Sequence, residues 1–510
     1  MSWKSITEHA RSAPDSPAIV DGAGTLTWRE VADQVARVAS RFLSVAPAPG
    51  ERVAVVGDNA AATLVAHLAG LRAGVGTVAT SRQLTAAEMA DQFTDAGVMA
   101  VVTGPIGRDA ATEAAARLGL RAVVVHGADA GRAERWPDWL AGPVEGIPAD
   151  RPASPPLVYT SGTTGRARGT EVRWTGERPA TATDYFDAVS SGSHFPTGPH
   201  LVVGPLQHNG PLTALRHLAA AEPVVVLSRF DAEECLRLIA RHRVASTVMV
   251  PTHFQRLLAL APETRERYDV SSLRLVSHTG SACPPEVKRA MIEWFGPVLV
   301  EAYGASEVGT VARIDSTEWL AHLGSVGKAA APFEAVVVDD DATPLPTGAV
   351  GHLAFRAPDG NGVRYHADPE KTRSAYLAPG LFTLGDVGYL DADGYIFITD
   401  RSADMVVSGG VNLYPAESEA VLTEHPDVAD VAVIGVPDKD LGEALRALVV
   451  ATGAPPDADE LDAFCRARLA GYKCPKSYEF VSGLARNAMG KLDKRFLRRP
   501  YWGSDRTITG

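Results

Sequence analysis

Continuous apolar runs alternate with helix-like stretches along the first half of the chain. Strands are predicted at 53–57, 99–103, 122–125, 156–159, 201–203, 224–227 and 246–250. Helices are predicted at 60–72, 110–118 and 231–243, the last with Asp231 as its N-cap. Unbroken apolar strands that alternate with helices indicate α/β architecture, with mostly parallel sheets flanked by helices.

The pattern changes near residue 400. Strands are predicted at 428–434, 444–450 and 478–481, with a helix over 459–469. This is the content of a compact α+β module of roughly 100 residues. We therefore expect a large N-terminal domain at 1–403 and a small C-terminal domain at 404–510.

Composition and charge narrow the class of protein. A chain of 510 residues is too long for a single hydrophobic core, so two or more domains are expected. A composition of 45% hydrophobic and 22% charged residues is typical of a globular protein. A net charge of −12 argues against nucleic acid as the main partner. The sequence contains no apolar run near the roughly 20 residues of a membrane span, and its N-terminus lacks an apolar signal core. We expect a cytoplasmic protein whose oligomeric state stays open, a homodimer included.

The cysteines and histidines add little chemistry of their own. Cys235, Cys283, Cys465 and Cys474 are widely spread, which predicts reduced and mostly buried thiols. The histidines have no spacing that suggests a zinc site.

The segment 159–169 carries a clear chemical signal. It combines glycines that let successive N–H groups point at one anion with hydroxyl donors and two arginines. This composition predicts a polyphosphate-binding loop, although a solvated surface loop has a similar one. The run Gly-Lys-Ser/Thr of the usual nucleotide P-loop is absent. The candidate phosphate-binding residues are Thr160, Ser161, Gly162, Thr163, Thr164, Gly165 and Arg168.

Further stretches with unusual chemistry follow along the chain. They lie at 205–210, 279–282, 301–307, 384–386, 400–404 and 486–492. Each alone has a structural explanation. His208 fits a hydrogen-bonded structural histidine, Tyr303 a core tyrosine beside a turn, and Lys491 a solvated charge. Asp386 and Arg401 fit an exposed ion pair of little energetic value.

Taken together and in this order, these stretches resemble the adenylate-forming superfamily of acyl-CoA synthetases, peptide-synthetase adenylation domains and luciferases. The resemblance extends from Thr25 to Leu497. It is nearest to fatty-acid or bile-acid-type CoA ligases because of the loop 208–211 and the run 409–415. It implies that the C-terminal domain is mobile, with a hinge at Asp404 and a site between the two domains.

The resemblance implies an ATP-dependent carboxylic acid–CoA ligase that works in two steps. A carboxylate first attacks the α-phosphate of ATP, which gives acyl-AMP and pyrophosphate. Because the acid is already ionised at neutral pH, this step needs positioning and charge neutralisation and no general base. The thiol of coenzyme A then attacks the acyl-AMP carbonyl.

The resemblance also implies residue roles at the nucleotide. The 160–169 loop would hold the β- and γ-phosphates, and Glu307 would hold Mg²⁺. Tyr303 would stack on adenine, opposite Gly280 and Ser281. The other implied nucleotide contacts come from Gly304, Ser306, Asp386 and Arg401, with the last two at the ribose. Lys491 would bridge the substrate carboxylate and the phosphate oxygens.

At the coenzyme A side the implied residues come from the small domain. Ser408, Gly409 and Gly410 would line a narrow pantetheine tunnel, because glycines leave the backbone unobstructed. His208 would stand as a gate between this tunnel and the carboxylate pocket. The acid pocket would draw on 189–194, 208–211 and 304–309, a mixture that favours a fatty, aryl or polycyclic acid.

Some positions depart from the family pattern. Arg168 replaces the lysine that is usual at the end of the phosphate loop, and Ser306 replaces a threonine before Glu307. Leu384 replaces the threonine that usually precedes Gly-Asp, and Ala485 replaces the proline that is usual before Arg486. Two other kinds of enzyme therefore stay open. One performs only the thioester step on acyl-AMP made elsewhere, and the other passes the acyl group to a carrier protein or an amine. A degenerate adenylate binder is disfavoured because Glu307, Asp386 and Lys491 are present.

Overall fold

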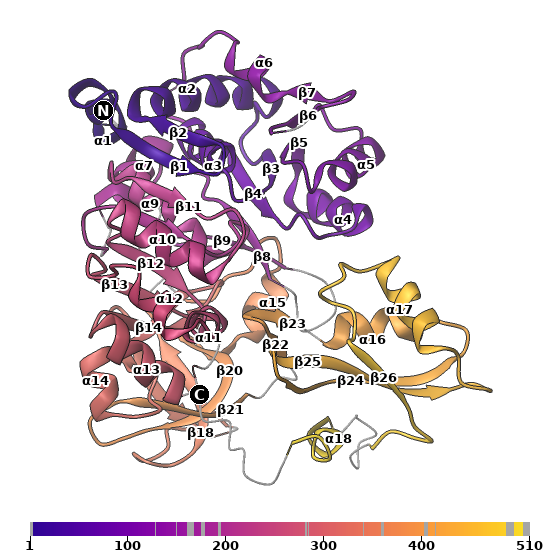
Figure 1. The fold of residues 1–510 in the computed structure, drawn as a ribbon. Coiled ribbons are helices and arrows are strands. Elements are labelled where there is room, and N and C mark those ends of the chain that lie inside the picture. Colours follow the sequence, from indigo (N-terminus) through magenta and orange to yellow (C-terminus); the bar gives the residue numbers. More distant parts are fainter. Residues whose placement is uncertain are drawn as a thin grey trace.

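The computed structural model describes residues 4–127, 129–148, 150–160, 168–174, 179–191, 195–280, 283, 285–339, 341–358, 362–401, 406–413, 415–485 and 494–502. The strands in this part of the chain form four sheets, three of them before residue 402 and one after residue 405. The last sheet and its helices form a separate body at one side of the molecule (Figure 1).

The first sheet has the order β7-β6-β5-β3-β4-β8-β9 and is parallel except for its last pair. Its strands are β3 (Arg52–Val56), β4 (Gly76–Thr80), β5 (Val98–Thr103), β6 (Ala122–Val125), β7 (Glu134–Arg135), β8 (Leu157–Thr160) and β9 (Arg168–Glu171). The predicted strands at 53–57, 99–103, 122–125 and 156–159 are confirmed to within a residue or two. Strand β4 was not predicted, because glycine and two threonines interrupt its apolar run.

The second sheet has the order β16-β15-β14-β13-β12-β10-β11-β1-β2, with a parallel centre and antiparallel ends. Its strands are β1 (Pro17–Asp21), β2 (Gly24–Thr27), β10 (His200–Val202), β11 (Val224–Val226), β12 (Ser246–Met249), β13 (Leu275–His278), β14 (Leu299–Ala305), β15 (Gly309–Asp315) and β16 (Lys328–Ala329). The predicted strands at 201–203, 224–227 and 246–250 are confirmed, again within about one residue.

Helices cover both sheets and fill the space between them. They are α1 (Lys4–Ser12), α2 (Trp28–Val45), α3 (Ala61–Ala73), α4 (Ala86–Ala96), α5 (Arg108–Leu118), α6 (Trp136–Leu140), α7 (Ala182–Ser191), α8 (Asn209–Leu212), α9 (Ala214–Ala219), α10 (Ala232–His242), α11 (Pro251–Leu258), α12 (Pro262–Glu266), α13 (Pro285–Phe295) and α14 (Ser316–Ala321). Asp231 caps α10 as predicted, since its side chain accepts the N–H of Glu234 at 2.8 Å.

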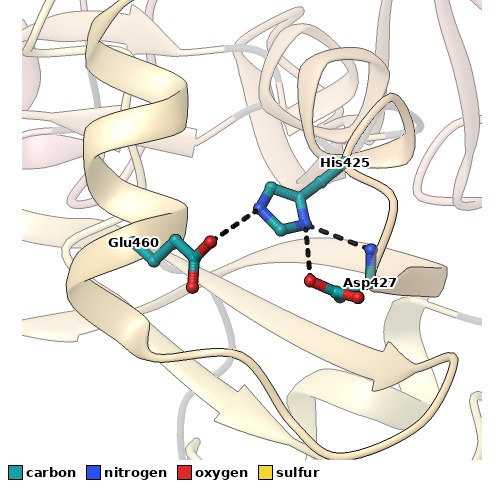
Figure 2. A group of neighbouring side chains, drawn as sticks. All are labelled: His425, Asp427 and Glu460. Atoms are coloured by element: carbon teal, nitrogen blue, oxygen red, sulfur yellow. Dashed lines mark hydrogen bonds and ion pairs between the residues drawn. The ribbon is translucent and has the colours of Figure 1, made fainter.

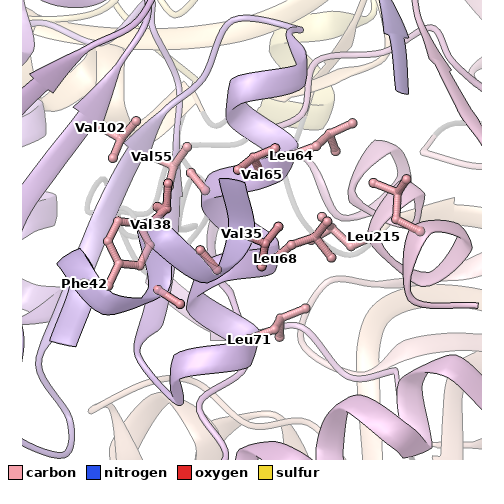
Figure 3. Packing of buried hydrophobic residues seen from close by; sticks show 14 of the residues in the cluster. Val35, Val38, Phe42, Val55, Leu64, Val65, Leu68, Leu71, Val102 and Leu215 are labelled. Atoms are coloured by element: carbon pink, nitrogen blue, oxygen red, sulfur yellow. The ribbon is translucent and has the colours of Figure 1, made fainter. Parts of the chain in front are cut away.

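Helix α3 is central to the main core. Almost every residue in it is buried, which is the pattern of a helix without a solvent face. Figure 3 shows Leu68 and Leu64 of this helix among side chains from α2, from the first sheet and from α9 of the second layer. The core thus joins the first two sheets into one body, on which the candidate site is built.

A third, antiparallel sheet closes the N-terminal part, and the sequence did not predict it. It contains β17 (Glu334–Val338), β18 (Gly351–Arg356), β19 (Tyr376–Ala378), β20 (Leu381–Leu390) and β21 (Ile396–Arg401), with helix α15 (Pro369–Ser374) before β19. Its strands mix buried and exposed positions irregularly, with register shifts in several pairs, so their hydrophobic period is weak.

The chain after residue 405 forms an α+β unit with its own core. It contains β22 (Val406–Ser408), β23 (Val411–Leu413), α16 (Pro415–Thr423), β24 (Val428–Asp438), β25 (Gly442–Ala451), α17 (Ala458–Arg466), β26 (Ser477–Phe480) and α18 (Lys494–Arg498). The predicted strands are confirmed. Helix α17 ends three residues before the predicted Leu469, although the N–H of Leu469 still donates to the Cys465 carbonyl at 2.8 Å.

Two other predictions can be checked against the described residues. All four cysteines are buried and form no disulfide. Among the described helices, none is both long and apolar enough to cross a membrane.

Candidate active site

The predicted phosphate loop connects two paired strands at the edge of the first sheet. Thr160 at the end of β8 lies opposite Arg168 at the start of β9. The hydroxyl of Tyr159 donates to Asp95 Oδ2 at 2.6 Å and anchors β8 to helix α4. Ser161, Gly162, Thr163, Thr164 and Gly165 lie outside the described residues, so their part in the site stays a prediction.

Thr160 is brought next to the predicted metal-binding carboxylate. Its Oγ1 donates to Glu307 Oε1 over 3.4 Å. Glu307 lies in the turn between β14 and β15, whose strands pair antiparallel on either side. A Cβ on Gly304 would collide with the Gly309 carbonyl, so only glycine permits this tight hairpin. The backbone carbonyl of Ser306 accepts the hydroxyl of Thr170 on β9 at 3.4 Å, which ties the hairpin to the phosphate loop.

Tyr303 and Asp386 meet across two sheets. The hydroxyl of Tyr303, on β14, donates to Asp386 Oδ2, on β20, at 2.5 Å. Asp386 is only 4% exposed, and its backbone pairs with that of Arg401 on β21. A buried carboxylate with a phenol donor is a structured polar site, in contrast to an exposed ion pair. The side chain of Arg401 lies outside the described part of the chain.

Arg168 makes an ion pair that the sequence did not predict. Its Nε lies 2.9 Å from Asp368 Oδ2, and the two side chains are 25% and 21% exposed. Asp368 also caps helix α15 by accepting the N–H of Lys371 at 2.9 Å. Nearby, the N–H of His366 donates to the Gly169 carbonyl at 2.8 Å. The end of the phosphate loop is therefore fixed to the third sheet, and the guanidinium already has an anionic partner.

His208 stands at the N-terminal end of α8, at the carboxyl end of the second sheet. The residue is solvent-accessible, yet loss of hydration lowers the pKa of its imidazole. The next residue, Asn209, buries its Oδ1 without a hydrogen-bond partner among the described residues. His208 and Asn209 thus place two polar side chains at the carboxyl end of the second sheet.

The glycine turn of the C-terminal unit lies against the N-terminal part. Gly409 and Gly410 join β22 to β23 in the left-handed region, with φ of +56° and +81°. A Cβ on Gly410 would come within 2.9 Å of Val250 Cγ2, and one on Gly280 would lie 3.9 Å from the Gly410 carbonyl. Ser408 pairs with Gly442 in the same sheet. The structure thus brings the predicted coenzyme A turn to the predicted adenine turn.

Like the loop residues 161–165, the predicted site residues Ser281, Asp404 and Lys491 fall outside the described part of the chain. Their roles stay predictions.

A buried charged network beneath the adenine turn was missed. Lys288 Nζ lies 2.6 Å from Glu301 Oε2 and 4.6 Å from the centre of the Trp319 ring. His278 Nε2 is 3.8 Å from the same carboxylate oxygen, at the end of β13 just before Gly280. Burial lowers the pKa of Lys288 and raises that of Glu301. The sequence shows one lysine in an amphipathic helix, which gives no sign that it points inward.

One further cluster has the residue types of a metal site. His425, Asp427 and Glu460 lie together in the C-terminal unit (Figure 2). Asp427 Oδ2 is 4.0 Å from Nδ1 of the ring, and Glu460 Oε1 is 3.9 Å from Nε2. The N–H of Asp427 also donates to Nδ1 at 3.3 Å. Because the carboxylates approach opposite ring nitrogens, the arrangement suits a structural contact between α16, α17 and β24.

Comparison with known proteins identifies the family. The family model described as AMP-binding enzyme matches residues 6–364, and the model of the AMP-binding enzyme C-terminal domain matches residues 417–491. A feruloyl-CoA synthase from an Amycolatopsis species is 33% identical over 98% of each chain. The chain belongs to the AMP-binding enzyme family.

Solved structures of related enzymes agree. The amide bond synthetase McbA from Marinactinospora thermotolerans matches with a TM-score of 0.83 at 30% identity, over 98% of this chain and 99% of that one. The o-succinylbenzoate CoA synthetase MenE from Bacillus subtilis matches at 27% identity in two forms. A double mutant bound to the product analogue OSB-NCoA gives a TM-score of 0.81, over 96% of this chain and 97% of that one. The complex with the acyl-adenylate OSB-AMP gives 0.64, over 97% of each chain.

The resemblance inferred from the sequence is thus confirmed. This AMP-binding enzyme is an AMP-forming acid–CoA ligase of α/β fold, with a large N-terminal part and a smaller C-terminal one. It acts through an acyl-AMP intermediate on a small carboxylic acid and uses ATP and coenzyme A.

Proposed function

We propose that the enzyme activates an aryl or polycyclic carboxylic acid, and that the described residues divide between its two half-reactions. The observation that carries the assignment of the adenylation site is the pair of contacts Thr160–Glu307 and Tyr303–Asp386, which join three sheets around one polar site. The feruloyl-CoA synthase and MenE act on aromatic acids by name, which supports the aryl class.

In the adenylation step, the nucleotide lies across the Tyr303–Asp386 contact. The Tyr303 ring stacks on adenine opposite the Gly280 turn, and the second Asp386 oxygen accepts a ribose hydroxyl. Arg401 assists at the ribose. The loop from Thr160 to Gly169 donates its N–H and hydroxyl groups to the β- and γ-phosphates. Lys491 bridges the substrate carboxylate and the phosphate, as a compact ammonium on a long stem does well.

The residues around Glu307 fit Mg²⁺. This hard cation prefers oxygen ligands, and Glu307 Oε1 with Thr160 Oγ1 offers two such atoms 3.4 Å apart. When bound, Mg²⁺ supplies charge neutralisation to the phosphates.

Arg168 does not bind the phosphates freely. Its guanidinium shares its charge with Asp368, so the contribution of Arg168 depends on how far phosphate displaces that carboxylate. An arginine in place of lysine at this position keeps a positive charge for adenylation. The competition between Asp368 and the phosphates for the Arg168 guanidinium then sets the strength of pyrophosphate binding.

In the thioester step, coenzyme A enters along the Gly409–Gly410 turn. Pantetheine amides meet the backbone there, with Ser408 at the edge of the passage. His208 and Asn209 lie at the carboxyl end of the second sheet, between this passage and the acid. Loss of hydration lowers the pKa of the His208 imidazole, which favours its neutral form as a hydrogen-bond donor or acceptor.

We place the domain boundary between residues 403 and 404, with Asp404 as the hinge. The C-terminal unit then carries both Lys491 and the glycine turn. The four buried, reduced cysteines support a cytoplasmic location.

An amine acceptor is the second candidate, and the similarity to the amide bond synthetase McbA favours it. A competition assay separates the two. Acyl-AMP formed in place is offered coenzyme A and a primary amine at equal concentration, and the products are read by mass spectrometry. We expect the thioester to dominate, and a dominant amide would transfer the assignment to amide synthesis.

The acid class is tested by ATP–pyrophosphate exchange with ferulate, o-succinylbenzoate, cholate and decanoate. We expect exchange with an aromatic or polycyclic acid that exceeds exchange with decanoate at least tenfold. Exchange with decanoate alone would contradict the proposed class. Absence of exchange with all four, together with thioester formation from synthetic acyl-AMP, would favour the thioester-only alternative.

A further inference from the structure

Lys473 connects the two units of the enzyme because its ammonium group forms an ion pair with one carboxylate from each unit. Its Nζ lies 3.2 Å from Glu88 Oε1, on helix α4 of the N-terminal part. The same Nζ lies 3.0 Å from Glu417 Oε2, on α16 of the C-terminal unit. The Lys473 side chain is 10% exposed and that of Glu417 is 3% exposed. A single cation therefore stands between one carboxylate from each unit, largely out of water.

Local structure fixes Glu88 in place for this contact. Glu88 Oε2 accepts the N–H of Thr85 at 2.9 Å and its hydroxyl at 3.0 Å, which closes the capping box of helix α4. The other oxygen, Oε1, is left to face Lys473. The N-terminal half of the contact is thus set before the units meet.

The lysine stays charged in this position. Burial alone would lower the pKa of Lys473, but the carboxylates of Glu417 and Glu88 outweigh that effect and raise it. If Glu88 lost its charge, Lys473 would keep Glu417 as a partner within its own unit. A neutral residue at 88 should therefore weaken the docking of the units while the C-terminal unit stays folded.

The same docked arrangement holds the glycine turn in the candidate site. Gly410 packs on Val250 and beside Gly280, both in the N-terminal part. The chain also superposes better on MenE with a product analogue than on MenE with its acyl-adenylate, at TM-scores of 0.81 and 0.64. The two forms align at equal identity over nearly equal lengths, so the arrangement seen here matches that of the product complex.

We propose that Glu88 and Lys473 are positioning residues for the thioester-forming half-reaction. Their ion pair holds the C-terminal unit where the Gly409–Gly410 turn lines the coenzyme A passage. The pair must separate when the unit turns to present Lys491 for adenylation. This inference rests on the proposed division of the two half-reactions. It assigns a role in the thioester-forming step to a contact between residues that belong to neither of the proposed binding sites.

The first test is the variant Glu88→Gln, measured in the two half-reactions separately. Glutamine keeps the amide oxygen that caps α4 and removes the charge that faces Lys473. With feruloyl-adenylate as the probe, we expect thioester formation to slow about tenfold, which corresponds to the loss of about 1.4 kcal/mol of docking. ATP–pyrophosphate exchange with ferulate should stay within about twofold, or increase. An equal fall in both half-reactions would overturn the proposal, because it would mean a general structural defect.

Two control variants sharpen this test. Glu113→Gln removes an exposed carboxylate that pairs with Arg117 on α5, and it should leave both half-reactions unchanged. Lys473→Arg keeps the cation and should retain more than half of the thioester rate. A Lys473→Arg variant as slow as Glu88→Gln would contradict a role for the charge.

The second test needs no substrate. Spin labels on Thr112→Cys in α5 and Ala463→Cys in α17 report the distance between the units, since both positions are exposed and the four native cysteines are buried. We expect one dominant distance in the parent enzyme and a second population in Glu88→Gln. An identical distance distribution in the parent enzyme and in Glu88→Gln would overturn the proposed role of the ion pair. This measurement uses no substrate, so its outcome does not depend on whether the proposed function is correct.

Discussion

The Arg168–Asp368 and Lys473–Glu88 ion pairs differ in what they connect. Arg168 and Asp368 both belong to the N-terminal part, and about a quarter of each side chain is exposed. The Lys473–Glu88 pair is more deeply buried and joins the two units. The first pair accompanies the phosphate loop wherever the C-terminal unit stands, whereas the second depends on docking. The described groups that we assign to the nucleotide thus all belong to the N-terminal part, whereas those that we assign to the thioester step come from both units.

The largest expected effect comes from Lys491→Ala. If Lys491 serves adenylation alone, acyl-AMP formation should fall about a thousandfold, equivalent to about 4 kcal/mol of transition-state stabilisation. Thioester formation from supplied acyl-AMP should stay within about threefold, because it uses the glycine turn. The measurement is rapid-quench kinetics of each half-reaction, and parallel losses would break the distinction between the two regions.

The complementary change is Gly410→Val. Its Cβ would approach Val250 Cγ2 to 2.9 Å, and a φ of +81° is strained for a branched residue. Docking of the turn should fail, so thioester formation should slow about a hundredfold, a barrier of about 2.7 kcal/mol. Pyrophosphate exchange should survive. Gly453→Val is the matched control, because a Cβ there meets nothing within 4 Å, and its rates should match the parent enzyme.

The buried Lys288–Glu301 pair tests stability within the N-terminal part. Lys288→Met leaves Glu301 as an unpaired buried carboxylate and should lower the free energy of unfolding by about 3–5 kcal/mol. Denaturant unfolding measures this change. The double variant Lys288→Met with Glu301→Leu removes both charges and should recover most of the loss. Two additive losses would show that the pair is not coupled.

A smaller effect is expected for Asp368→Asn. Asparagine still caps α15 but frees the Arg168 guanidinium for phosphate. Since such partly exposed pairs are worth up to about 1 kcal/mol, KM for ATP should fall about two- to fivefold with thioester formation unchanged. Asp341→Asn, at an exposed position in the same part, is the control. A rise in KM would mean that Asp368 orients Arg168 toward the phosphates and does not compete with them.

The parallel core of the fold was predictable, and the third sheet was not. Strands such as Val53–Val56 and Val224–Val226 are buried on both faces, so their sequences are continuous apolar runs. Strand β20 instead mixes buried and partly buried positions around Gly385 and Asp386, and its register shifts against β18 and β21. A sheet of this kind leaves no clear period in the sequence.

The site divides in the same way. Tyr303, Glu307 and Asp386 lie in short motifs whose order along the chain identified the family. Their contacts with Thr160 and with each other follow from that fold. Asp368 and Glu88 were missed because their local sequences show only helix caps. The partner of Glu88 lies 385 positions away, and no local pattern encodes such a pairing.

The most direct test of the account compares Glu88→Gln and Asp368→Asn in one rapid-quench experiment. Both variants and the parent enzyme are given ATP and ferulate, and coenzyme A is added after acyl-AMP has accumulated. We predict opposite selectivity, with Glu88→Gln slow only after coenzyme A addition and Asp368→Asn altered only before it. If both variants change the same half-reaction, the two regions do not serve separate steps and the central claim is wrong.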